Sequence, residues 1–110
     1  MATAARLDSS FQALANATRR AIVERLLLGP ATVSELAAPF RMALPSFLQH
    51  LDVLESCGLV RSRKKGRVRT VRLVPARLDL AAHWLDKQRA IWNSRLDRFD
   101  SYVTTLEKNP

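Results

Sequence analysis

The stretch Ala43–Gly58, ALPSFLQHLDVLESCG, decides the fold of this chain. It predicts one helix, because Phe47, Leu51 and Leu54 recur at i, i+4 and i+7 and form one apolar stripe. Gly58 follows directly and can adopt the left-handed conformation that ends a helix. This helix is therefore expected to bury one face and expose the other.

The exposed face of this helix is small and polar near its N-terminus. Pro45 fits the first turn, where its missing N–H costs little. Side chains near the start of a helix are those that read base edges in a DNA major groove. An ordinary amphipathic helix with a solvated face would show the same pattern. The neighbouring segments of the chain must therefore distinguish a DNA-reading helix from an ordinary one. The polar positions are Ser46, Gln49, His50 and either Asp52 or Glu55.

Upstream, apolar spacing predicts two further helices. The first covers Leu7–Ala15, after a loosely structured start at residues 1–6, with Asp8 or Ser9 as its N-cap. The second covers Arg19–Leu28, which carries a second apolar face.

The next segment supplies the start of a helix-turn-helix. Thr18 is expected to cap the second helix, and Gly29-Pro30 ends it. Thr32–Glu35 then matches a capping box, which opens a short helix that Pro39 limits. Residues 40–42 form the turn into the next helix. A short helix, a tight turn and a second helix that is polar near its start predict a helix-turn-helix.

After Gly58 the apolar period changes from about 3.6 to about 2. Leu59–Arg63 and Val68–Val74 read as two strands, and Gly66 supplies a positive φ in the turn between them. Eight Lys and Arg residues and no acid fall in the seventeen residues 61–77. A basic hairpin after a helix-turn-helix is a wing, although a charge run is commonly only a solvated surface. We expect DNA phosphate contacts from Arg63, Lys64, Lys65, Arg67 and Arg69.

The chain closes with a long helix predicted over residues 78–106. At 1.5 Å per residue it would be roughly 43 Å long, which exceeds the diameter of ~26 Å expected for a compact domain of this size. Its apolar seam therefore needs a second surface, either the same helix or the first helix of a second copy. Alternatively the seam packs on its own core, or Trp84 and Ile91 do so instead. The residues expected to dimerise are Leu85, Trp92, Leu96, Phe99, Val103 and Leu106.

Composition agrees with a basic helical protein. The chain has 110 residues, a formal charge of +8 and a pI near 11.1, which favours a polyanionic partner. The longest apolar run is three residues, so we expect no membrane span or signal-peptide core and a cytoplasmic location. A single cysteine, Cys57, excludes an intramolecular disulfide. We expect one domain over residues 1–110, with a DNA-binding core at 7–74, a wing at 59–74 and the closing helix.

Two sequence motifs resemble the ArsR/SmtB family of winged-helix transcriptional regulators. The segment 11–20, FQALANATRR, is similar to the family's F-x-A-L-A-D-P-T-R-R, and the segment 50–60, HLDVLESCGLV, is similar to its H-L-x-x-L-x-x-A-G-L-[IV]. The segment 84–99 is similar to a branch without known metal sites. The resemblance implies a mainly α fold with a small β-hairpin. It also implies a homodimeric repressor that binds a palindromic operator and leaves it when an effector binds.

The family pattern also suggests which residues read DNA. The resemblance places Leu44, Ser46, Gln49 and His50 near DNA. Gln can pair with adenine, and Ser with a base or a phosphate. The chain departs from the family at Ala43, where a Ser often caps the reading helix, and at Leu48, where Ser is also frequent.

No metal, cofactor or catalytic site is expected. Two His and one Cys cannot complete a closed Zn²⁺ site in one chain, although Asp79 and His83 from two copies leave a shared site open. There is no phosphate loop and no nucleophile–base set, so the chain is not expected to be an enzyme. The effector stays unknown. The alternative function is a winged-helix module for protein interaction, RNA binding or non-specific nucleic-acid binding.

Overall fold

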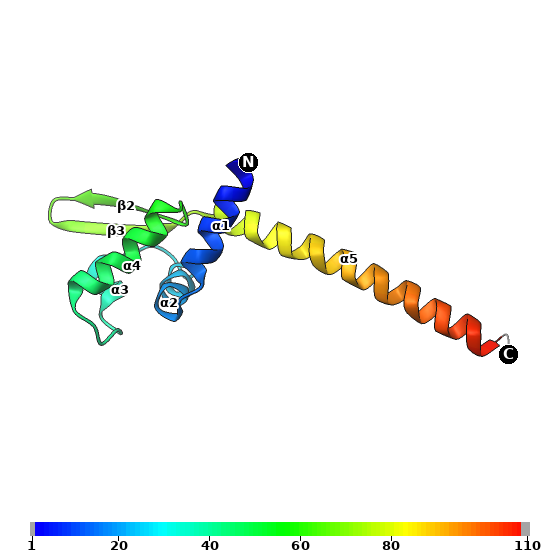
Figure 1. The fold of residues 1–110 in the computed structure, drawn as a ribbon. Coiled ribbons are helices and arrows are strands. Elements are labelled where there is room, and N and C mark those ends of the chain that lie inside the picture. Colours follow the sequence, from blue (N-terminus) through cyan, green and yellow to red (C-terminus); the bar gives the residue numbers. More distant parts are fainter. Residues whose placement is uncertain (1, 109–110) are drawn as a thin grey trace.

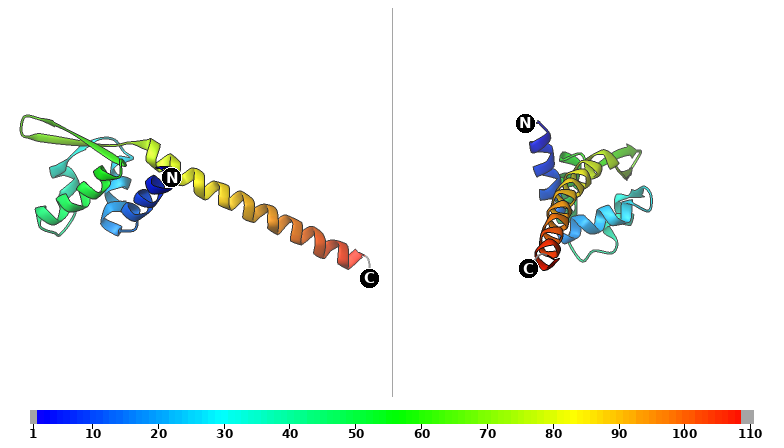
Figure 2. Two further views of the ribbon diagram at one scale, coloured as in Figure 1. Left: turned by 45° about the horizontal axis from the view of Figure 1, so that its top comes forward. Right: turned by 90° about the vertical axis from the view of Figure 1, so that its right-hand side faces the viewer.

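The computed structural model describes residues 2–108 and shows a small helical core with two projections. A β-hairpin leaves the core on one side and a long helix on the other, so the molecule measures 76 × 32 × 22 Å (Figures 1 and 2). This is the predicted winged helix-turn-helix with a long closing helix. The elements in order are α1 (Ala2–Leu14), α2 (Ala17–Leu26), β1 (Ala31–Thr32), α3 (Val33–Ala37), α4 (Leu44–Ser56), β2 (Val60–Lys65), β3 (Val68–Leu73) and α5 (Pro75–Lys108).

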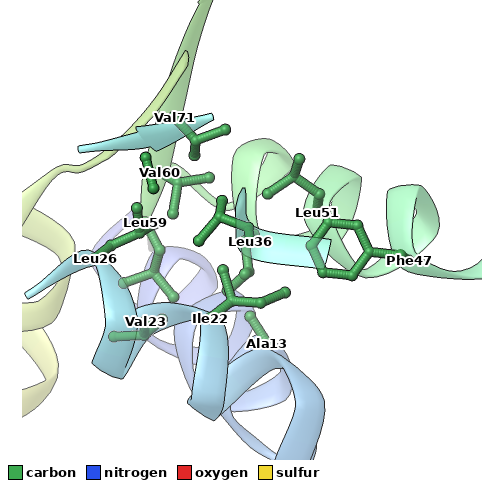
Figure 3. Packing of buried hydrophobic residues seen from close by; sticks show 12 residues of the cluster. Ala13, Ile22, Val23, Leu26, Leu36, Phe47, Leu51, Leu59, Val60 and Val71 are labelled. Atoms are coloured by element: carbon green, nitrogen blue, oxygen red, sulfur yellow. The ribbon is translucent and has the colours of Figure 1, made fainter. Parts of the chain in front are cut away.

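The core forms where α4 meets α2, α3 and the sheet. The apolar stripe of α4 is buried as predicted, since Phe47, Leu51 and Leu54 are each at most 1% exposed. Phe40, in the turn before α4, packs its ring 5.7 Å from that of Phe47. Figure 3 shows how side chains of α1, α2, α3, α4, β2 and β3 converge there. The buried cluster comprises Ala13, Ile22, Val23, Leu26, Ala31, Leu36, Phe47, Leu51, Leu54, Leu59, Val60 and Val71.

Helix α4 ends at Gly58 as predicted. Gly58 has φ +82°, and its N–H donates to the Glu55 carbonyl at 3.1 Å. The N–H of Leu59 donates to the Leu54 carbonyl at 3.0 Å. This pair of bonds is a Schellman motif, and both leucines are fully buried. The turn therefore directs the chain from α4 straight into β2.

The first helix begins earlier than predicted. The loosely structured start assigned to residues 1–6 is wrong for the described part, because α1 already begins at Ala2. Alanine has the highest helix propensity, and the segment Ala2–Ala5 contains three of them. Asp8 and Ser9 lie inside α1 and cap nothing; the Ser9 hydroxyl donates to the Ala5 carbonyl at 2.9 Å.

The second helix is capped by Asn16, so the expected Thr18 cap is wrong. The Asn16 side-chain oxygen accepts from the Arg19 N–H at 3.1 Å, and α2 runs from Ala17 only to Leu26. Asparagine is among the strongest N-cap residues. Because Asn16 precedes Thr18 in the sequence, the helix begins after Asn16 and includes Thr18.

The capping box before α3 is confirmed. The Thr32 hydroxyl accepts from the Glu35 N–H at 3.2 Å, and the Glu35 carboxylate accepts from the Thr32 N–H at 3.3 Å. Both orphan donors at the start of this short helix are thereby satisfied.

The predicted hairpin exists, and a short third strand joins it. The antiparallel order is β1-β3-β2, with Ala31 opposite Val71, and β1 is too short to be read from sequence. Strand β2 reaches Lys65, two residues beyond prediction, which leaves the two-residue turn Gly66-Arg67. Gly66 alone of the pair has positive φ, +62°, as the first central residue of a type II′ turn requires.

The closing helix is longer than predicted. It begins at Pro75, where the missing N–H of proline costs nothing, and ends at Lys108, so it is about 51 Å long. Trp84 contacts α1, with its ring edge-on to Phe11 at 5.8 Å. Every residue from 82 to 102 is exposed, including Ile91. Leu78, the first apolar residue of the predicted seam, packs against the core. Over residues 82–102 the alternative in which the seam or Ile91 packs on the chain's own core is wrong.

The uncapped start of α4 gives a stability prediction. Ala43 occupies the N-cap with φ −63° and ψ 145° and makes no side-chain cap bond. We expect Ala43→Ser to raise the free energy of unfolding by about 0.5–1 kcal/mol, because the hydroxyl can accept from the first turn of α4. Urea unfolding measures this change. Ala43→Val is the control, because it adds a side chain without an acceptor; equal stability of the Ser and Val variants would contradict the cap.

Candidate nucleic-acid interface

A concave groove of about 770 Å³ lies between α3, α4 and the hairpin. The N-terminal end of α4 and the hairpin tip both point away from α5 (Figure 1). The groove joins the predicted reading helix to the predicted wing in one surface. Its lining residues are Thr32, Val33, Ser34, Leu44, Leu48, Ser62, Lys64, Arg67, Val68 and Arg69.

Three of the four predicted reading residues are exposed on α4. Ser46 and Gln49 reach solvent, and Leu44 is 54% exposed at the edge of the groove. Leu48 is half-buried and also lines the groove. This end of α4 thus presents both polar and apolar groups, and which of them contact bases stays a prediction.

His50, the fourth predicted reading residue, is half-buried and bonded to Arg19 of α2. Its Nδ1 lies 3.1 Å from the Arg19 Nη1. A guanidinium only donates, so the ring nitrogen is the acceptor in this contact. His50 therefore links α4 to α2, a contact that sequence spacing did not reveal.

Arg19 and Arg20 also complete the end of α1. Arg19 donates to the carbonyls of Ala13 at 2.7 Å and Gln12 at 3.1 Å, and Arg20 donates to that of Leu14 at 2.9 Å. The last carbonyls of a helix lack intrahelical partners and carry its negative dipole end, which cations stabilise. The two arginines of the FQALANATRR motif thus have a structural role, because their hydrogen bonds connect α2 to α1 and, through Arg19, to α4.

Arg69 is held by α4 and so differs from the other wing cations. Its Nε donates to the Ser62 hydroxyl at 2.9 Å, and its Nη2 pairs with the Glu55 carboxylate. Ser62 donates to the same carboxylate at 2.8 Å. This triad ties both wing strands to the reading helix. The sequence alone groups Arg69 with the phosphate contacts and Glu55 with a solvated face, because no local pattern shows that these two side chains meet.

The remaining predicted wing cations are exposed. None of them forms an ion pair within residues 2–108. Strand register places Lys64 opposite Arg69, on the face toward α4, and Lys65 opposite Val68 near the tip. The charge therefore covers both faces of the hairpin and its turn. These residues are Arg63, Lys64, Lys65 and Arg67.

The apolar seam of α5 is exposed along most of its length. Tyr102, which is not among the predicted dimerisation residues, is 62% exposed on the same helix. The predicted dimerisation residues are exposed by 51% at Leu85, 61% at Trp92, 42% at Leu96, 63% at Phe99 and 54% at Leu106, with Val103 half-buried.

The described residues contain no group of three or more His, Cys, Asp or Glu side chains placed to hold a metal ion. Asp79 and His83 are both exposed on α5. The Cys57 thiol donates to the Leu54 carbonyl at 3.3 Å. Across residues 2–108, no helix combines the length and apolar character needed to cross a membrane.

Comparison with known proteins places this geometry in a family. A helix-turn-helix domain model matches residues 14–63. The HTH-type transcriptional regulator Rv2034 of Mycobacterium tuberculosis is 45% identical over 82 residues, which are 70% of this chain and 77% of that protein. The transcriptional repressor SdpR of Bacillus subtilis is 30% identical over 61 residues, which are 56% and 68% of the two chains.

Solved structures of similar proteins support the same family assignment. The crystal structure of the ArsR family transcriptional regulator RHA00566 is 50% identical, with a TM-score of 0.77 over 81% of this chain and 92% of that one. The homodimeric winged helix-turn-helix DNA-binding domain Mb0332 of Mycobacterium bovis is 28% identical, with a TM-score of 0.63 over 88% and 87%. The chain belongs to the ArsR family of winged helix-turn-helix transcriptional regulators.

Proposed function

We propose that this transcriptional regulator is a homodimeric repressor that binds a palindromic operator and does not respond to metal. The observation that carries the proposal is the groove between α4 and the hairpin, whose lining residues Lys64 and Arg67 form no ion pair within residues 2–108. The chain would act as one domain, with its DNA-binding core at residues 7–74 and α5 as the dimerisation helix. The proposed function includes no catalysis.

DNA recognition divides between two elements. Ser46 and Gln49 on α4 are proposed to reach base edges in the major groove, with Leu44 packing beside them. The exposed wing cations Arg63, Lys64, Lys65 and Arg67 are proposed to contact phosphates. Arg69 is excluded from this set because Glu55 and Ser62 already engage it. His50 is proposed to position α4 through Arg19.

Dimerisation is proposed to bury the exposed seam of α5. Burying several large apolar side chains is favourable by roughly 25 cal/mol for each Å² removed from water. The related Mb0332 domain is homodimeric. A twofold dimer would place two α4 helices in successive major grooves, about 34 Å apart, which matches a palindrome.

The proposal makes two further claims, that the protein represses transcription and that it does not respond to metal. The relative SdpR is a repressor, which supports the first part. The second is supported by the shortage of ligands, since Asp79 and His83 offer only two per chain.

The direct test is a binding titration of the protein against its own upstream promoter DNA and against random duplex of equal length. We expect a preference of about 10³-fold or more for the promoter at physiological salt. Equal binding to both duplexes would contradict sequence-specific regulation and favour the non-specific nucleic-acid module. Strong binding to neither would favour the protein-interaction module.

The wing predicts a change in salt dependence. In the double variant Lys65→Gln/Arg67→Gln, the slope of log K against log salt concentration should fall by about 1.8, because each phosphate contact contributes about 0.9. Titrations at several salt concentrations measure the slope. The control is Lys87→Gln/Arg98→Gln, which removes two exposed cations from α5 far from the hairpin. An equal drop in both double variants would show that only total charge matters.

The seam predicts loss of the dimer. Leu96→Asp together with Phe99→Asp should halve the mass measured by analytical ultracentrifugation, because two carboxylates would be buried at the interface. Binding to the promoter should weaken at the same time. The matched control is Ser94→Asp on the outer face of α5, which should leave the mass unchanged. An unchanged mass in the double variant would place the dimer interface elsewhere.

A further inference from the structure

A second cavity, of about 360 Å³, lies where three elements meet at the base of the hairpin. Figure 1 shows the place: β3 runs into the start of α5 beside α1. Arg6 comes from α1, Arg61 from β2 and Arg77 from the first turn of α5. Val74, Leu80 and the backbone of Gly58 complete most of the wall.

The cavity is strongly cationic. Its three arginines form no ion pair or side-chain hydrogen bond within residues 2–108, and no acidic residue lines it. Arg61 also lies directly opposite Arg72 in the hairpin register, although like charges facing each other across two strands are destabilising. An anion bound there would reduce the mutual repulsion of these guanidinium groups.

The position of Arg77 is restricted by its neighbours. Its Nε lies 2.9 Å from the point that a Cβ on Gly58 would occupy. A side chain at position 58 would therefore displace this guanidinium from its present place beside the end of α4. The residue that ends the reading helix thus also admits one of the cations of the cavity.

We propose that this cavity binds a small anion that carries carboxylate or phosphate groups. Guanidinium groups present paired N–H donors whose geometry matches carboxylates and phosphates. The volume falls at the lower end of the range for small-molecule sites, which suits a metabolite-sized anion and not a polymer.

The anion is an effector, because the cavity lies where the hairpin joins α5 and where the direction of α5 is set. The Val74 N–H donates to the Leu59 carbonyl at 2.8 Å, so the start of α5 is joined to the end of α4 next to the cavity. An anion bridging Arg6, Arg61 and Arg77 fixes the direction of α5 relative to the hairpin. In a dimer that direction sets the separation of the two α4 helices. This regulatory part rests on the proposed dimeric DNA-binding function, whereas anion binding itself does not.

Isothermal titration of the full chain with inorganic phosphate and with citrate tests the binding. Each is compared with sodium chloride at equal ionic strength. We expect saturable binding of at least one of the two anions. Arg61→Gln and Arg77→Gln should each weaken it about tenfold or more, because each removes a charge-assisted contact. Circular dichroism checks that both variants fold, and Arg61, exposed on a strand, is the safer substitution.

The control variant is Arg98→Gln, which removes the same charge from the far part of α5. It should bind the anion as the parent chain does. An equal loss in this variant, or no saturable binding of either anion, would overturn the proposal.

Promoter titrations with and without the bound anion test the regulatory part. The affinity for DNA should change in the parent chain and stay constant in Arg61→Gln/Arg77→Gln. A double variant that lowers the salt slope of DNA binding without any anion would show that these arginines contact DNA, and would overturn the effector site. Because this experiment starts from measurable DNA binding, a failed effector site stays distinct from a failed DNA-binding function.

Discussion

Burial of the apolar stripe of α4 is the constraint on which the rest of the structure depends. Phe47, Leu51 and Leu54 lie in the centre of the core, and each such side chain contributes about 1.5–3 kcal/mol when buried. Because a helix is rigid, burying this stripe also determines which residues face outward. Ser46 and Gln49 are exposed for that reason, and any rotation of α4 that moved them inward would expose its leucines.

Polar contacts then set the placement of the surrounding parts. Arg19 joins α1, α2 and α4 through backbone carbonyls and His50, while Arg69 and Ser62 join the hairpin to Glu55 of α4. Both arginines satisfy acceptors inside the protein, so they add rigidity and leave the outer cations to act on a partner. The basic charge of the chain is thus divided between structural and exposed groups.

Helix α5 differs from α4 because most of its large apolar side chains are exposed. Its first turns meet the rest of the chain, where Leu78 packs against the core, Ala81 is buried and Trp84 contacts Phe11. Beyond that, large apolar side chains point to solvent over several turns, which an isolated chain would not stabilise. This exposed seam is the surface that the proposed second copy would cover.

By itself the sequence determined the order of the helices and of the two hairpin strands, and their main faces. Local rules were sufficient for this: the period of Phe47, Leu51 and Leu54, the Thr32 capping box and the positive φ of Gly58 depend on neighbours within a few residues. It was less reliable where two local signals competed, as at Asn16 and Thr18, and where a helix former extended α1 to Ala2.

Only the tertiary structure decided which charged residues are engaged and which are exposed. The partners of Arg69 and of His50 lie 14 and 31 positions away in the sequence, so no spacing rule connects them. The same holds for the cavity that unites Arg6, Arg61 and Arg77, whose guanidinium groups come from three elements. Local periodicity sets the face on which a side chain lies, but the packing of the elements sets what that side chain meets.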